Sequence, residues 1–95
     1  MLIHIVSFKY QADVDAKARQ EHRDKLRALA ELAGIVDLNV GEDVVHSPRS
    51  YDTGLVIRFR DRASLDTYRD HPRHVPVAQL GATLSEHIVA VDFEA

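Results

Sequence analysis

Two periods of apolar residues along this chain predict where its strands and helices lie. From Leu2 to Tyr10 the side chains alternate between two faces, which is the period of a strand. From Ala12 to Ala33 the apolar positions recur every three or four residues with charged side chains between them, the pattern of one amphipathic helix. Gly34 stands where a left-handed residue commonly ends a helix. The chain therefore opens with a strand and a long helix.

Strand character returns three times after Gly34. Residues with β-branched or alternating apolar side chains predict strands over Ile35–Val45, Tyr51–Arg60 and His87–Phe93. The turn-forming stretch His46–Ser50 separates the first two of them. Gly41, inside the first, predicts a bulge or a bend.

Two short helices are expected between the last two strands. Asp61 can cap the first of them, and Pro72 ends it at or near His71, because proline disfavours helical backbone in the residue before it. The second covers Val75–Leu84 and is weakened by one proline and one glycine within it.

The resulting order is β-α-β-β-α-(α)-β, which predicts an α+β fold of the ferredoxin-like type. Such a subunit has a four-stranded antiparallel sheet with its helices on one face. The strands carry apolar residues on both sides, and an apolar sheet face left in water marks an association site. We therefore expect a homodimer related by a two-fold axis, whose two sheets form an α+β barrel.

Composition narrows the class of protein further. The 95 residues, 45% hydrophobic and 28% charged, predict one globular domain over residues 1–95. The absence of cysteine excludes disulfides and thiolate chemistry. A net charge of −3 with both signs interspersed argues against nucleic acid as a partner. The chain begins directly in strand-like alternation and has no stretch of transmembrane length, so we expect a cytoplasmic protein without a membrane partner.

Candidate chemistry is concentrated around Pro72. One phenol, Tyr68, and two imidazoles, His71 and His74, lie where this proline breaks the helix. His4 on the first strand can meet them if its face of the strand turns toward the helices. A neutral imidazole and a phenol can together remove a proton next to a carbonyl and hold the resulting enolate oxygen.

Each of these side chains also has an ordinary structural interpretation. His4 can be a buried, hydrogen-bonded histidine, and Tyr68 a core residue with its hydroxyl at the surface. His71 can be a cation that suits a helix C-terminus, and His74 can hydrogen-bond the backbone beyond Pro72.

No metal or other cofactor is expected. Three histidines, His4, His71 and His74, could form an open metal site, but no carboxylate at matching spacing completes it. The remaining histidines are expected at the surface or at strand edges; they are His22, His46 and His87.

Taken together, these segments resemble the stress-responsive α/β-barrel (Dabb) domain family. The resemblance spans nearly the whole chain and is carried by several short motifs: Ile3-His4-Ile5-Val6 with Phe8-Lys9, Asn39-Val40-Gly41, Tyr51-Asp52, Leu55-Val56-Ile57-Arg58-Phe59, His71-Pro72-Arg73-His74 and Val91-Asp92-Phe93-Glu94. It implies a ferredoxin-like subunit and a homodimeric barrel.

The resemblance also implies a set of site residues. A plant branch of the family contains polyketide cyclases, which close a linear poly-β-ketone by intramolecular aldol condensation. Its pocket histidines and tyrosine correspond here to His4, Tyr68 and His74, the expected catalytic residues. The residues expected to contact a ligand beside them are Val6, Phe8 and His71.

Three functions remain open from the sequence. The first is the binding of a small apolar or aromatic metabolite in a pocket between sheet and helices. The second is an acid/base enzyme of the aldol-cyclase type that uses His4, Tyr68 and His74. The third is a purely structural dimer with no pocket.

Overall fold

The computed structural model describes residues 1–95. Its strands are β1 (Leu2–Tyr10), β2 (Ile35–Glu42), β3 (Thr53–Phe59) and β4 (Ser85–Glu94). Its helices are α1 (Ala16–Ala28), α2 (Arg62–Arg69) and α3 (His74–Leu84), and a 3₁₀ turn at Leu29–Glu31 follows α1.

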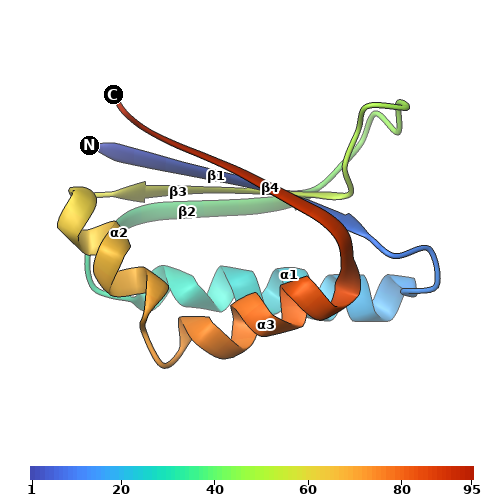
Figure 1. The fold of residues 1–95 in the computed structure, drawn as a ribbon, viewed down its shortest axis with the longest axis horizontal. Helices are drawn as coiled ribbons and strands as arrows, with labels where there is room; N and C mark the ends of the chain where they lie inside the picture. The colour runs from blue at the N-terminus through green and yellow to red at the C-terminus, as the bar shows by residue number, and fades with distance from the viewer.

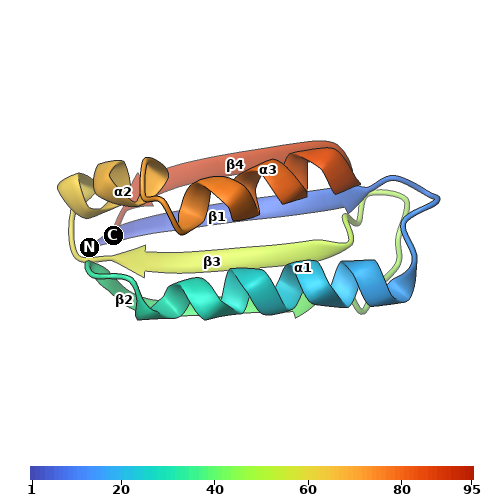
Figure 2. The same cartoon turned by 90° about the horizontal axis from the view of Figure 1, so that it is seen from below.

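The strands form one sheet in the order β2-β3-β1-β4, and every neighbouring pair is antiparallel. All three helices cover the same face of this sheet (Figure 1). Viewed from the helix side, α1 and α3 lie side by side along the strands, while α2 covers one end (Figure 2). The predicted ferredoxin-like α+β fold is therefore confirmed. None of the helices combines the length and the apolar character needed to cross a membrane.

The long first helix is shorter than its apolar period predicts. It begins at Ala16 rather than Ala12, because the Asp15 carboxylate accepts a hydrogen bond of 2.9 Å from the Ala18 backbone N–H and so caps the helix there. At its other end the backbone tightens into the 3₁₀ turn. Gly34 then reverses the chain with a φ of +88°, as its position predicts.

The last helix runs without interruption through both residues that were expected to weaken it. Pro76 is the third residue of α3, where a backbone N–H has no partner within the helix, so its missing donor costs nothing. Gly81 is buried, and a Cβ there would lie 3.0 Å from His22 Nε2 and 3.2 Å from Phe8 Cε1. The glycine thus allows α3 to approach α1 and β1 closely.

Strand β2 departs from a regular ladder at a different place from the one predicted. Gly41 pairs with Gly54 in ordinary register, so the prediction of a bulge at Gly41 is wrong. The irregularity lies between Ile35 and Asp37, where the chain enters the strand from the turn at Gly34.

The core lies between the sheet and the helices. On β1 the side chains at alternate positions, from Leu2 to Tyr10, face this core. Facing positions on β3 include Ile57 and Phe59, which are completely buried. Leu26 of α1 and Leu65 of α2 close the core from the helix side.

The opposite face of the sheet, which no helix covers, is also apolar. Ile5, Val56 and Val91 form one row across three adjacent strands of it. Exposed side chains on β4 extend this row, with Val89 at 52% and Phe93 at 44% of full exposure. We refer to this surface as the open face.

Candidate active site

A small cavity lies between the helix side of the sheet and the helices. Its volume is about 140 Å³, and most of its lining is apolar. The lining side chains come from every strand except β2 and from all three helices: His4, Val6, Phe8, Leu26, Leu55, Tyr68, His74, Val77, Ala78 and Ile88. The structure thus places His4, Tyr68 and His74 on one cavity, with Val6 and Phe8 in its wall.

His4 enters the cavity because its side of β1 turns toward the helices. It pairs with Asp92 in the antiparallel register of β1 and β4, and its ring Nδ1 is hydrogen-bonded to the Asp92 carboxylate. Arg69 of α2 approaches the other carboxylate oxygen at 3.9 Å. Because an ionised carboxylate only accepts hydrogen bonds, Nδ1 is a nitrogen that carries a proton, and in the neutral tautomer Nε2 is then the acceptor.

Tyr68 lies between the two histidines. Its ring centroid is 4.1 Å from that of His74 and 6.2 Å from that of His4. The side chain is buried, and burial raises the pKa of the Tyr68 phenol above its ordinary value of 10.0. The phenol therefore keeps its proton at neutral pH and is suited to donate a hydrogen bond.

His74 is oriented by the break between α2 and α3. Its Nδ1 lies 3.1 Å from the carbonyl oxygen of Arg69, the last residue of α2. A carbonyl can only accept, so Nδ1 is the protonated nitrogen and Nε2 of the neutral ring is free to act as a base. The same bond satisfies a carbonyl at the helix end, so His74 has a structural role as well.

The pKa of His74 is lowered from its ordinary value of 6.5, and burial is the largest cause. The bond to the Arg69 carbonyl opposes this effect, while His4 and His71 add to it. The imidazole is consequently neutral at pH 7, the state that general base chemistry requires.

His71 does not line the cavity. Its ring Nδ1 accepts a hydrogen bond of 3.0 Å from the backbone N–H of Arg73, and its carbonyl accepts from the N–H groups of His74 and Val75. These bonds shape the turn around Pro72 and fix where α3 begins. His71 therefore stabilises the backbone turn, and it is not among the residues that line the cavity.

Comparison with protein families adds an independent observation to this geometry. A family model described as the stress responsive A/B barrel domain matches residues 2–95. The chain belongs to this family. No curated protein matches it in sequence.

Solved structures with the same fold are similar along almost the whole length of this stress responsive A/B barrel domain. A dimeric ferredoxin-like protein of unknown function from Thermobifida fusca has a TM-score of 0.90 at 23% identity, covering 99% of this chain and 90% of its own. A second such dimeric protein, from Jannaschia sp., has a TM-score of 0.84 at 26% identity, with coverages of 99% and 98%. The hydroxynitrile lyase from Passiflora edulis has a TM-score of 0.86 at 16% identity, with coverages of 97% and 90%.

Two polar residues of this A/B barrel domain are more important than their sequence pattern indicates. Asp92 was expected only as one position on the last strand, yet it is the partner of His4. His22 was expected at the surface, and this prediction is wrong because the side chain is completely buried. Its spacing from Leu26, one helical turn away on the same apolar stripe, is the signal that would have placed it inside.

His22 belongs to a buried chain of hydrogen bonds across the core. Arg23 donates to the Thr53 hydroxyl at 3.0 Å, Thr53 donates to the Tyr10 hydroxyl at 3.0 Å, and Tyr10 is 2.7 Å from His22 Nδ1. Burial, followed by the charge of Arg23, lowers the pKa of His22 from 6.5 to about 4. This chain lies next to the cavity through Phe8, whose ring packs edge-on against His22.

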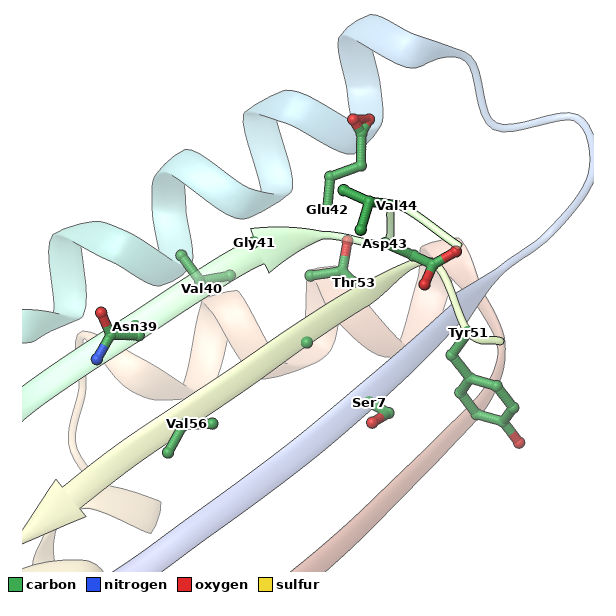
Figure 3. A pocket seen from close by; sticks show the side chains of 11 residues that line it. Ser7, Asn39, Val40, Gly41, Glu42, Asp43, Val44, Tyr51, Thr53 and Val56 are labelled. Atoms are coloured by element: carbon green, nitrogen blue, oxygen red, sulfur yellow. The ribbon is translucent and has the colours of Figure 1, made fainter. Parts of the chain in front are cut away.

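No three histidine, aspartate or glutamate side chains are grouped as a metal site requires. A second, larger hollow of about 580 Å³ lies on the open face, at the ends of β2 and β3. Figure 3 shows Asn39, Val56, Ser7 and Tyr51 around it, with Asp43 at its rim. It is a broad depression in the surface without an imidazole, so it does not offer the acid/base groups of the inner cavity.

Proposed function

We propose that this domain binds a small apolar or aromatic molecule in the cavity between the sheet and the helices. This proposal rests on one observation: the imidazoles of His4 (β1) and His74 (α3) and the phenol of Tyr68 (α2) line the same mainly apolar cavity. Ligand sites commonly combine such an apolar lining with a few placed polar groups. A volume near 140 Å³ is comparable to an engineered cavity that takes up benzene, so one ring-sized group fits.

The hydrogen bonds support a second candidate function, acid/base catalysis of the aldol-cyclase type. His74 offers Nε2 as a base for a proton next to a carbonyl, and its lowered pKa keeps it neutral. Tyr68 has no hydrogen-bond partner for its hydroxyl and can donate to the enolate oxygen that forms. His4, held by Asp92, is a second imidazole in the lining of the same cavity. The hydroxynitrile lyase among the similar folds is an enzyme, although its identity of 16% relates only the folds.

We also propose that the domain works as a homodimer whose open faces pack together. The exposed apolar row on β4 is the kind of surface that marks an association site. The loop between β2 and β3 rises on this same side of the sheet (Figure 1), and its Val44 and Val45 are 84% and 71% exposed. Two of the similar structures described above are themselves dimeric proteins.

Binding can be tested with benzyl alcohol as the probe. In a titration followed by amide NMR, we expect the largest shifts at cavity residues such as Val77 and Ala78. The variant Ala78→Leu enlarges a side chain of the cavity lining and should reduce these shifts, while Ala82→Leu, on the same helix but outside the lining, should leave them unchanged. Equal shifts in both variants, or shifts confined to the open face, would contradict the proposed site.

Catalysis can be tested with a poly-β-ketone substrate. His74→Ala should lower turnover by about 10² to 10⁴-fold, the usual contribution of general acid/base catalysis, and His71→Ala should lower it far less. Thermal unfolding of both variants separates chemistry from folding. If His74→Ala loses stability but keeps its rate, the catalytic candidate is wrong.

A further inference from the structure

A third hollow lies on the outer surface, between α1 and α3. Its volume is about 430 Å³, and its apolar floor includes Leu29, Pro76 and Leu80. The two helices that form it lie side by side over the sheet (Figure 2). We refer to this hollow as the helix groove. It is on the opposite side of the molecule from the open face, so the proposed dimer leaves it uncovered.

The rim of the helix groove is positively charged. Lys25 of α1 and Arg73 at the start of α3 both line it, and Lys25 takes part in no ion pair. Arg73 reaches across to α1, donating to the Ala28 carbonyl at 3.4 Å and to Glu31 at 3.3 Å. Glu31 cancels one of the two positive charges. The remaining single positive charge matches a monoanion, such as a carboxylate, better than a doubly charged phosphate ester.

The helix groove and the inner cavity share one wall. Val77 of α3 lines both, with the groove on one side and the cavity on the other. Arg73 lines the groove, and His74, the next residue in the chain, lines the cavity. A narrow molecule that displaces the Val77 side chain would reach from Tyr68 in the cavity to Lys25 on the rim of the groove.

We propose that the helix groove holds the carboxylate of an amphipathic organic acid whose aromatic or apolar end occupies the inner cavity. This inference rests on the proposed binding function and gives that function a ligand class. The cavity accepts the ring-sized end, the floor of the groove accepts the connecting methylene groups, and Lys25, the cation that Glu31 leaves unpaired, binds the carboxylate.

The test compares phenylbutyrate with phenylbutanol, which share the ring and chain and differ in charge at neutral pH. We expect calorimetry to show tighter binding of the acid than of the alcohol. Lys25→Gln should reduce this preference by roughly two- to fivefold, the usual range for an exposed ion pair. Glu31→Gln should increase the preference, since it frees Arg73. Lys17→Gln, an exposed lysine of α1 outside the groove, should change nothing.

The outcomes distinguish this inference from the proposed function. If both compounds bind equally and Lys25→Gln has no effect on their ratio, the groove proposal is overturned while the cavity remains a binding site. If neither compound binds, the proposed binding function fails and the groove proposal with it. Arg73→Gln also removes the contacts of Arg73 with Ala28 and Glu31, so its result is read from the acid-to-alcohol ratio, which a general loss of packing leaves unchanged.

Discussion

His4 and Asp92 face each other across the β1–β4 ladder, and the carboxylate holds the proton-bearing Nδ1 of the imidazole. Such a carboxylate selects one tautomer of the ring and fixes its plane. The hydrogen bond thus holds in one orientation a ring that lines the cavity.

Asp92→Ala should remove this selection. We expect imidazole ¹⁵N NMR to show His4 mainly as the Nδ1–H tautomer in the wild-type protein and as a mixture in the variant. The free energy of unfolding should fall by about 1 kcal/mol, as for one hydrogen bond of a partly exposed charged group. Asp66→Ala is the matched control, because Asp66 also lies near Arg69 but does not contact His4. An unchanged tautomer in Asp92→Ala would refute the positioning role.

Acid should destabilise the fold through His22. Its pKa is about 4 in the folded protein, against an ordinary 6.5, so the unfolded chain binds more protons between these values. The free energy of unfolding should therefore be fully retained above pH 6.5 and fall toward pH 4, by at most about 1.4 kcal/mol per pH unit. Urea denaturation across this window measures the slope. His22→Asn can keep a hydrogen bond to Tyr10 without titrating, and it should flatten the curve.

Gly34→Ala should destabilise the protein by about 1–3 kcal/mol. The left-handed φ of +88° disfavours any residue with a Cβ, and that atom would lie 2.7 Å from the Ser64 side chain. Thermal unfolding measures the loss. At Gly41 a Cβ meets nothing within 4 Å, so Gly41→Ala is the control and should unfold near the wild-type temperature.

Val91→Glu should convert the proposed dimer into a monomer. The side chain is 54% exposed at the centre of the apolar row on the open face, and a charge buried there without a partner would oppose association. Light scattering should give twice the mass of one chain for the wild-type protein and the mass of one chain for the variant. Val75→Glu places the same charge on α3 and should remain dimeric. A monomeric wild-type protein would refute the barrel.

Alternation and helical period were sufficient to predict the order of elements and that His4, Val6 and Phe8 share one face of β1, but not that this face turns toward the helices. They could not predict the partner of His4. Successive side chains of a strand point to opposite faces, so a shift of one residue in the pairing of β1 and β4 would put a different residue beside His4. Identifying Asp92 therefore required the register between the two strands, which a single sequence does not specify. The boundaries of α1 were set by the Asp15 cap and the 3₁₀ turn, local hydrogen bonds that the apolar period does not report.

The position of β1 between β3 and β4 has a consequence for how the protein is made. As the chain leaves the ribosome, β1 can pair with β3 long before β4 has been synthesised, so one edge of the central strand stays unpaired until the end. The residue that completes the site, Asp92, is 88 positions from His4 and emerges with that last strand. A chain shortened before β4 would therefore lose its protection against aggregation and its candidate active site in the same event.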